Sequence, residues 1–235
     1  MLSAHVAVAK TPKYATGESG DTVEVVERAK GGISVILSDG QGSGRSAKTT
    51  STMVVNKAVS LLADGARDGA VARAVHDYLY AIRHGKVSAT LAIISVDLYT
   101  KTLLISRNSH TPVFILTNKE VKILTKEVSP IGVHRVMKPD ISELPLEEGL
   151  IVVTFSDGIL DAGKRTGQSN NLNDILGIIE GYRPEDTSFL TEALLGYATK
   201  LDGGRPGDDM AVVAVGIGDN PEESRVRKMS MNLPF

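Results

Sequence analysis

Cysteine is absent from this chain of 235 residues. Its absence excludes a disulfide framework, a thiolate zinc site and a cysteine nucleophile, and it is typical of proteins kept in a reducing compartment. Long apolar runs are also missing, since the longest, residues 150–155, is far below the ~18 residues of a membrane span. The apolar run at residues 4–9 is short and has no basic residues before it, which does not fit a signal peptide. We therefore expect a cytoplasmic protein that does not cross a membrane.

The chain has little excess charge of either sign. Its 26 Lys and Arg residues against 28 Asp and Glu residues give a formal net charge of −2, so there is no broad basic face to bind nucleic-acid phosphates. An apolar fraction of 42% and a charged fraction of 23% are those of an ordinary globular protein. No linker or internal repeat divides the chain. We expect one domain over residues 1–220, a polar tail over residues 221–235, and no nucleic-acid partner.

Two apolar stretches near the N-terminus predict a β-hairpin. Residues 21–28 and 33–39 have the pattern of two strands joined by a short turn. If residues whose numbers add up to 60 are paired, the apolar sides of the two strands agree. The same register places Asp21 opposite Asp39. Two carboxylates side by side at the end of a hairpin are the first indication of a functional site.

The remaining pattern predicts helices and further antiparallel strands. Apolar residues recur at helical spacing over residues 54–62, 71–82, 172–179 and 190–197. Strands are expected at residues 88–97, 102–107, 112–117, 120–125, 150–156 and 210–217. Because short turns join the first four of these strands, we expect them to form an antiparallel meander. Regular alternation of strand and helix is absent, which favours an α+β fold with antiparallel sheets over a doubly wound parallel sheet.

Acidic residues lie at the ends of these expected strands. Asp39 and Asp157 each follow an apolar strand in the tripeptide Ser-Asp-Gly, and Asp208 and Asp209 precede one. If the strand before Asp157 and the strand after Asp208 are neighbours, these two side chains share one edge of the sheet. Two carboxylates ~4 Å apart repel each other by about 4 kcal/mol at an effective dielectric constant near 20. A cluster of four would therefore take up protons or bind cations.

The composition of this cluster indicates which cation it would bind. Oxygen ligands without cysteine or histidine favour Mg²⁺ or Mn²⁺ over zinc, and two such ions ~3.5–4 Å apart can activate water and stabilise a phosphoryl-transfer transition state. The glycines after Asp39 and Asp157 allow tight turns, and the carbonyl of Gly40 could itself reach a metal. Taken one at a time, each aspartate is more typical of a turn or a helix cap. The metal-centre interpretation depends on their joint placement.

Four short motifs occur in a fixed order along the chain. They are Gly20-Asp21, residues 38–44 (Ser-Asp-Gly-Gln-Gly-Ser-Gly), Ser156-Asp157-Gly158 and Gly207-Asp208-Asp209-Met210. In this order they resemble the motifs of PPM (2C-type) metal-dependent protein serine/threonine phosphatases, and more closely the SpoIIE-like branch, which includes regulators of sigma factors and stressosomes. Residues 89–100 and 109–112 resemble that branch as well. The likeness extends from about residue 18 to residue 217, and the size and layout are similar to those of the small freestanding stressosome (RsbX-like) phosphatases.

The resemblance implies an antiparallel β-sandwich flanked by helices, in four layers (α-β-β-α), with two Mn²⁺ or Mg²⁺ ions at one end. It implies that Asp39 bridges both ions and that the carbonyl of Gly40 is a ligand. Asp157 and Asp208 would complete the shell of one ion, and the first acid of the paired motif, Asp208, is favoured over the second. Asp21 would act on the other ion, directly or through water.

The same resemblance implies a reaction and a substrate. Asp39 and Asp157 would act in catalysis through metal-bound water, and a metal-bound hydroxide would attack a phosphoserine or phosphothreonine directly, without a phosphoenzyme. The substrate would be a phosphorylated bacterial regulatory protein, a STAS-domain component of a stressosome or of a sigma-factor switch.

Two positions depart from the family pattern. Many 2C-type enzymes have a histidine directly after the Asp-Gly pair and an arginine before the first aspartate, whereas this chain has Gln41 and no arginine within residues 14–20. An acid for the leaving alkoxide and a guanidinium for the substrate phosphate are then missing, and such losses cost orders of magnitude in rate. We therefore expect a slow phosphatase that depends on a partner. The alternative is a catalytically silent module that keeps the fold and binds a partner.

Two further patterns have competing interpretations. Residues 42–49 fit the glycine-rich loop of a dinucleotide site and nearly fit a P-loop, so a nucleotide-binding switch is a less favoured alternative. Both motifs need a parallel strand–helix–strand unit, whereas a second helix is expected after this one. His110 follows Ser109, but no acid is placed to orient it and no Gly-x-Ser-x-Gly elbow is present. We expect His110 to be a turn residue.

Overall fold

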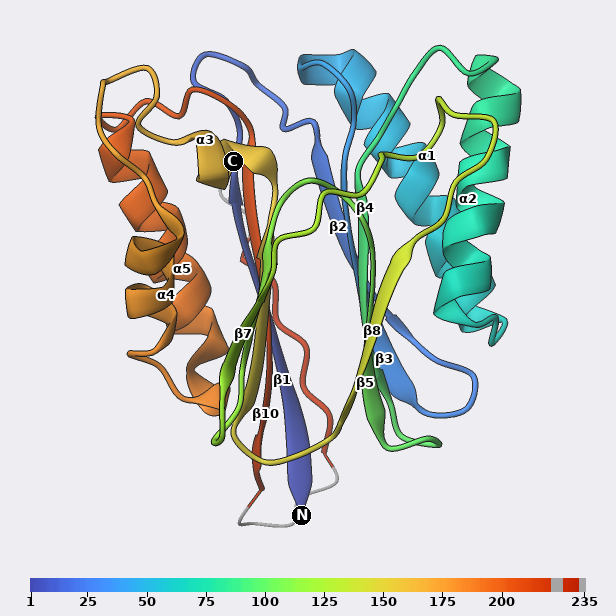
Figure 1. The fold of residues 1–235 in the computed structure, drawn as a ribbon, viewed down its shortest axis with the longest axis vertical. Helices are drawn as coiled ribbons and strands as arrows, with labels where there is room; N and C mark the ends of the chain where they lie inside the picture. The colour runs from blue at the N-terminus through green and yellow to red at the C-terminus, as the bar shows by residue number, and fades with distance from the viewer. Residues whose placement is uncertain (221–225, 233–235) are drawn as a thin grey trace.

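The computed structural model describes residues 1–220 and 226–232 and contains two antiparallel sheets that pack face to face (Figure 1). The first sheet has the strand order β1 (Leu2–Thr11), β10 (Met210–Asp219), β9 (Leu150–Phe155), β6 (Val113–Leu116) and β7 (Val121–Leu124). The second sheet has the strand order β2 (Asp21–Glu27), β3 (Gly32–Asp39), β4 (Leu91–Asp97), β5 (Thr102–Asn108) and β8 (Asp140–Pro145).

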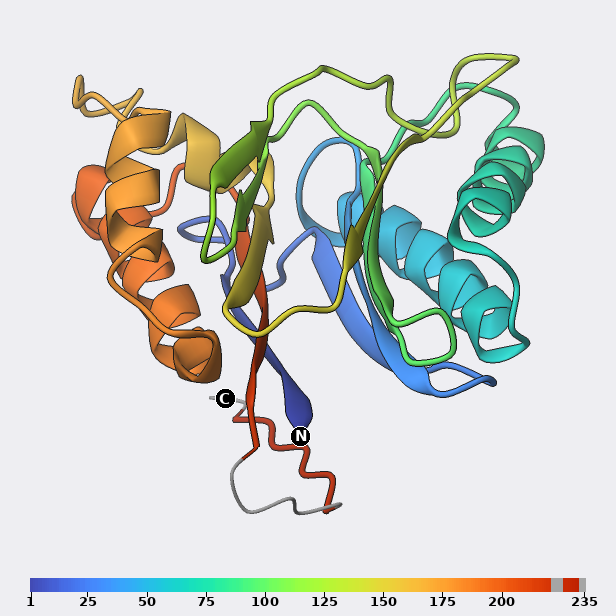
Figure 2. The ribbon, with the colours of Figure 1, turned by 60° about the horizontal axis from the view of Figure 1, so that its bottom comes forward.

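Helices cover the outer face of each sheet, which gives the layers helix, sheet, sheet, helix (Figures 1 and 2). The second sheet is covered by α1 (Gly44–Ala63) and α2 (Asp68–Arg83). The first sheet is covered by α3 (Asp157–Asp161), α4 (Leu172–Ile179), a 3₁₀ helix at Pro184–Asp186 and α5 (Thr187–Leu201). The α+β sandwich with helices on both sides, expected from the sequence, is confirmed.

Apolar side chains fill the spaces between these layers. Between the two sheets, Leu37 and Ile94 of the second sheet pack with Val152 and Val213 of the first. Because neighbouring residues of a strand point to opposite faces, Ile36 packs with α1 and α2 instead. The strand β9 is buried along its whole length, since it lies inside a sheet that is covered on both faces. This position explains its unbroken apolar run.

The β2–β3 hairpin has the register expected from the sequence, with Asp21 opposite Asp39. The strands β9 and β10 are antiparallel neighbours, as the site interpretation required. Because β9 leads into Asp157 and Asp208 leads into β10, these two aspartates lie at the same end of the first sheet.

The expected meander is wrong. The pairs β4–β5 and β6–β7 are hairpins, but β5 and β6 belong to different sheets, and residues 109–112 cross between them. Pro112 in this link has no N–H to donate to a strand ladder. The buried Arg107 fastens the crossing, because it donates to the carbonyl of Thr111 at 3.1 Å and to the carbonyl of Lys126. The short link at residues 109–112 is therefore not a hairpin turn within one sheet, because it carries the chain from the second sheet to the first.

The sequence pattern predicts neither of two strands that lie at the edges of the sheets. The strand β1 closes one edge of the first sheet by pairing with β10, and β8 closes one edge of the second sheet by pairing with β5. Both alternate between more and less exposed residues, so their apolar signal is weak. In the part of the chain that the structure describes, no helix is long and apolar enough to span a membrane.

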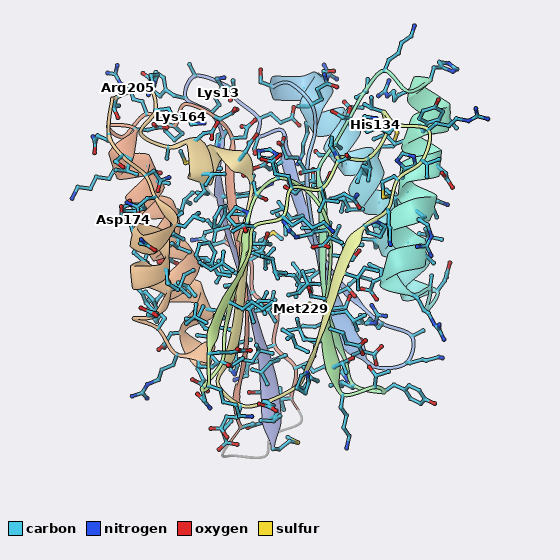
Figure 3. The ribbon with its side chains drawn as sticks, viewed as in Figure 1. Lys13, His134, Lys164, Asp174, Arg205 and Met229 are labelled. Atoms are coloured by element: carbon cyan, nitrogen blue, oxygen red, sulfur yellow. The ribbon has the colours of Figure 1, made fainter. Side chains whose placement is uncertain are left out.

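Of the expected tail, residues 221–225 and 233–235 lie outside the described residues, and residues 226–232 have no regular secondary structure. Arg227 forms an ion pair with Glu27 at the end of β2, with 3.2 Å between Nη1 and Oε2. Both side chains of this pair are more than half exposed, so the pair contributes little to stability. Met229, labelled in Figure 3, is exposed as well.

Candidate metal centre

Four aspartates expected to form a site lie at the end of the sandwich where α1 and α3 begin, which is the upper end of Figure 1. Asp21 is the first residue of β2 and Asp39 the last residue of β3, both in the second sheet. Asp157 is the first residue of α3. Asp208 lies two residues before Met210, the first residue of β10 in the first sheet. Each of the other three repels the Asp39 carboxylate, so the structure brings the four together from both sheets.

Backbone contacts fix the position of Asp39 and Gly40. The N–H of Asp39 donates to Thr90 Oγ1 at 3.1 Å, and the carbonyl of Asp39 accepts from the N–H of Thr90 at 2.9 Å. Gly40 pairs with Ala89 in an isolated bridge. A Cβ atom on Gly40 would lie 2.2 Å from the carbonyl oxygen of Ala47, so only glycine lets the first turn of α1 pack this closely. The end of β3 and the start of α1 are therefore locked together.

The side chain of Asp21 is fully buried, and neither carboxylate oxygen has a hydrogen-bond partner among the described residues. Burial, with added repulsion from Asp209 and Asp157, raises the pKa of Asp21 to about 7. Ser156 lies near enough to oppose this rise, but its Oγ–H donates to the carbonyl of Asp209 at 3.4 Å, while Oγ accepts from the N–H of Ala211 at 2.9 Å. A buried carboxylate without a partner indicates that a proton or a cation belongs beside it.

Two further carboxyl groups of the cluster have raised pKa values. Burial, followed by repulsion from Asp21, raises the pKa of Asp39 to about 9. Burial and then repulsion from Asp208 raise the pKa of Asp157, while the nearby His110 opposes the rise. In the absence of a neutralising cation, these groups hold protons at higher pH than an ordinary aspartate does.

Asp208 and Asp209 have different surroundings. Asp209 is buried, and its Oδ1 and Oδ2 atoms accept from the N–H groups of Lys13 and Gly20, each at 2.9 Å. Asp209 therefore fastens the segment that leads into β2. Asp208 is half-buried, and its Oδ1 atom accepts from the N–H of Asp209 at 3.0 Å. Asp208 thus keeps more oxygen capacity free for a ligand than Asp209 does.

The donor set of this cluster fits a divalent cation, but the side chains do not already surround one point. Within residues 1–220 and 226–232, no group of three or more histidine, aspartate or glutamate side chains is arranged to hold a metal ion. The fit lies in the chemistry of the donors, which are hard carboxylate oxygens, with both oxygens of Asp21 unsatisfied. The arrangement is a carboxylate cluster in which repulsion among the aspartates is only partly offset, by Lys10 near Asp21 and His110 near Asp157.

His110 joins this cluster, although the sequence pattern assigns it to an ordinary turn. It lies in the bend between β5 and β6, and its Nε2 atom is 3.9 Å from Asp157 Oδ2. The expectation that no acid lies beside His110 is therefore wrong. The crossing of residues 109–112 between the sheets carries His110 there, and the only sequence signal for it is the likeness of these residues to the SpoIIE-like branch.

Basic side chains also gather at this end of the molecule. Figure 3 shows Lys13, Lys164 and Arg205 on the loops at the end where α3 lies. The Arg205 guanidinium lies 5.2 Å from the centre of the Tyr14 ring, and Lys164 Nζ lies 2.6 Å from Asp161 Oδ1. Lys164 is thus engaged with a neighbour in sequence, and Arg205 with a ring from the segment between β1 and β2.

Gln41, at the position where many 2C-type enzymes have histidine, is turned toward Ser88. Its side-chain Oε1 atom accepts from the backbone N–H of Ser88 at 2.9 Å and from Ser88 Oγ at 3.2 Å. The backbone N–H of Gln41 donates to the Ser88 carbonyl at 3.1 Å. Gln41 therefore joins two loops, and its amide, unlike a histidine side chain, cannot act as a general acid.

Residues 42–49 do not belong to a nucleotide-binding unit. The strands β3 and β4 on either side of α1 and α2 are antiparallel neighbours, whereas both nucleotide motifs need a parallel unit. Lys48 is directed to the carboxylate cluster instead, because its Nζ atom donates to the backbone carbonyl of Asp21 at 3.1 Å and to Thr22 Oγ1 at 3.0 Å. The antiparallel topology excludes both motifs.

Comparison with known proteins places this architecture in a family. The model of the family Stage II sporulation protein E (SpoIIE) matches residues 29–218. The chain belongs to the SpoIIE family. Stage II sporulation protein E of Bacillus subtilis (strain 168) is 23% identical to it over 228 residues, which cover 92% of this chain and 27% of that protein. This SpoIIE-family chain therefore spans about a quarter of the length of that relative.

Solved structures show the same fold. The PP2C phosphatase domain and a fragment of the regulatory domain of SpoIIE from Bacillus subtilis match with a TM-score of 0.80 at 21% identity, over 91% of this chain and 63% of that one. RsbX in complex with magnesium matches with a TM-score of 0.70 at 15% identity, over 93% of this chain and 100% of that one. The PP2C-like fold implied by the sequence motifs is therefore confirmed.

Proposed function

We propose that this SpoIIE-family chain is a metal-dependent protein serine/threonine phosphatase. The observation that carries the proposal is the carboxylate cluster at the meeting point of the two sheets, in which both carboxylate oxygens of the buried Asp21 lack a hydrogen-bond partner among the described residues and Asp39 is repelled by its neighbours. Membership of the SpoIIE family and the PP2C-like fold support the same reaction. The family resemblance makes the substrate a phosphoserine or phosphothreonine of a bacterial regulatory protein in the cytoplasm, and a STAS-domain protein of a partner-switching pathway in particular.

We assign the cations to the side chains of Asp21, Asp39, Asp157 and Asp208 and to the carbonyl of Gly40. Two Mn²⁺ or Mg²⁺ ions, when bound, would supply an activated water and positive charge beside the phosphoryl group. The oxygen-only donor set supports these metals, and so does the structural likeness to RsbX, whose solved structure contains magnesium.

The residues of the chain have distinct parts in this proposal. Asp39 is repelled by the carboxylates of both sheets and would be the residue that both ions share when bound. Asp157 and Asp208 belong to one side of the cluster and Asp21 to the other, so each side can hold one ion. The contacts of Gly40 with Ala47 fix its carbonyl relative to Asp39. The Asp39–Gly40 segment is thus held by backbone packing.

Release of phosphate from p-nitrophenyl phosphate tests the proposed reaction. We expect Mn²⁺-dependent turnover by the unmodified chain and a loss of at least about a hundredfold in Asp39→Asn, because the amide is a poor metal ligand and carries no charge. Asp77→Asn, at an exposed position of α2, is the matched control and should retain full activity. Turnover that needs no metal, or that survives Asp39→Asn, would show that the cluster is not the catalytic centre.

A catalytically silent binding module remains the second candidate, because the Gln41 side chain is taken up by Ser88 and offers no acid to a leaving group. Such a module would bind its partner protein yet release no phosphate with either metal. The same assay separates the two functions, since a slow phosphatase should release some phosphate from the small substrate with Mn²⁺ or Mg²⁺ even where a partner protein raises its rate, whereas a silent module should release none.

A further inference from the structure

A shallow cavity of about 420 Å³ lies along one face of α1. Its lining includes Glu18 from the segment before β2 and Arg45, Lys48, Thr49 and Met53 from α1. Arg45 and Lys48 are three residues apart and therefore lie next to each other on the same face of the helix. The cavity thus presents two cationic side chains in a chain whose net charge is slightly negative.

Lys48 connects this cavity to the carboxylate cluster. Lys48 belongs to the cavity lining, and its Nζ atom lies 3.1 Å from the backbone carbonyl oxygen of Asp21. Lys10 approaches the same carbonyl oxygen at 3.5 Å. Because α1 starts just after the Asp39–Gly40 segment, Arg45 lies one helical turn nearer to that segment than Lys48 does. Arg45 therefore lies at the end of the cavity that is nearer to the Asp39–Gly40 segment.

The charges of the cavity favour an anion. Arg45 is exposed, and its guanidinium makes no hydrogen bond or ion pair within the part of the chain that the structure describes. The first turn of α1 contains no acidic residue, and Ser43 does not cap it with its side chain. Glu18 is the single carboxylate among the residues that line the cavity. Two cations against one carboxylate leave a positive balance in a cavity that Lys48 connects to Asp21.

We propose that Arg45 binds the phosphoryl group of the substrate. It would supply the guanidinium that is missing from residues 14–20, where many 2C-type enzymes have an arginine. This inference rests on the proposed phosphatase function. The planar guanidinium can donate two parallel hydrogen bonds to two phosphoryl oxygens, which an ammonium group cannot match. Lys48, held by Asp21 and Thr22, adds positive charge at the cavity wall, and Glu18 limits the affinity for an anion.

Steady-state kinetics with p-nitrophenyl phosphate and Mn²⁺ test the role of Arg45. We expect Arg45→Ala to raise KM about tenfold or more, because it removes a charge-assisted pair of hydrogen bonds, and Arg45→Lys to raise it less. Arg73→Ala is the matched control, since Arg73 is an exposed arginine on α2 outside the cavity lining. The Kd for Mn²⁺ should agree within about twofold among all these proteins, because Arg45 is not a metal ligand.

Glu18→Gln should change KM in the opposite direction to Arg45→Ala. Removal of the one carboxylate from the cavity lining should lower KM for the same substrate by roughly twofold to fivefold, because a repulsive charge is lost. Thermal unfolding of each variant shows whether the protein remains folded, and both positions are exposed, so we expect little change.

Binding of inorganic phosphate, measured by calorimetry in the presence of Mn²⁺, separates this inference from the proposed function. If the unmodified chain releases no phosphate but binds it more tightly than Arg45→Ala does, the phosphatase function fails and the anion site stands. If turnover occurs and Arg45→Ala matches Arg73→Ala in both KM and phosphate affinity, the role of Arg45 is overturned. A loss confined to phosphoprotein substrates would also overturn it, because Arg45 would then contact the partner protein and not the phosphoryl group.

Discussion

Asp21 and Asp39 face each other across the last residue pair of the β2–β3 hairpin, where two ionised carboxylates destabilise the strand pair. Their pKa values of about 7 and about 9 lie above the ordinary value of 3.8. Between pH 3.8 and about pH 9 the metal-free folded chain binds more protons than the unfolded chain does, because these two carboxyl groups lose their protons at higher pH when the chain is folded. Stability must therefore fall as the pH rises through this range, because the folded state loses the protons that neutralise the cluster.

We expect the free energy of unfolding of the metal-free protein to decrease steadily from about pH 5 to about pH 9. Asp39→Asn should flatten this dependence and stabilise the metal-free protein by about 1–2 kcal/mol near pH 8, because the amide is neutral at every pH. Urea denaturation at a series of pH values in the presence of a chelator measures both effects. Asp77→Asn serves as the control, and a metal-free stability that is constant or rises over this range would contradict the assignment.

The glycines of the site show how far single residues can be interpreted from sequence. Gly40 and Gly158 were expected to serve tight turns, but neither has a positive φ angle. They serve close packing instead, since a Cβ atom would lie 2.2 Å from the Ala47 carbonyl oxygen in one case and 2.1 Å from the Asp209 carbonyl oxygen in the other. The position of these glycines is visible in the sequence, whereas the distant backbone that excludes a side chain is not.

At the scale of single elements, the sequence pattern predicts the features that depend on pairing between strands adjacent in the chain. The β2–β3 register follows from alternation on two strands joined by a short turn, and the structure confirms it. The change of sheet after β5 depends on the buried Arg107 and on a carbonyl from Lys126, which is remote in sequence. The proximity of His110 to Asp157 follows from that change of sheet, so it could not be predicted either.

The contact between α3 and β10 gives a prediction about one element. Gly158→Ala should destabilise the protein by about 1–3 kcal/mol and weaken Mn²⁺ binding, because the new Cβ atom pushes the start of α3 away from Asp209. Gly177→Ala in α4 is the control, since nothing lies within 4 Å of its Cβ position, and it should be neutral or stabilising by about 0.5–1 kcal/mol. Chemical denaturation measures both stabilities. Equal stability of the two variants would show that the close approach of α3 is not needed.

At the scale of the whole molecule, the site lies where the two sheets meet. We propose that residues 1–220 form one domain, because the layer between the sheets contains side chains of both, such as Leu37 and Val213. The strand and helix order predicts an antiparallel α+β fold, but the sandwich with helices on both sides was implied by the motif resemblance. The convergence of two carboxylate pairs follows from how the sheets pack, which no residue pattern within either sheet specifies.

Titration of the metal-free protein with Mn²⁺ by calorimetry at about pH 7, in two buffers of different ionisation enthalpy, tests the central claim most directly. If the cluster holds protons in place of cations, binding should saturate at two ions per chain and release protons, and Asp39→Asn should abolish it. Absence of Mn²⁺ binding by the unmodified chain, or binding that is unchanged in Asp39→Asn, would contradict the account.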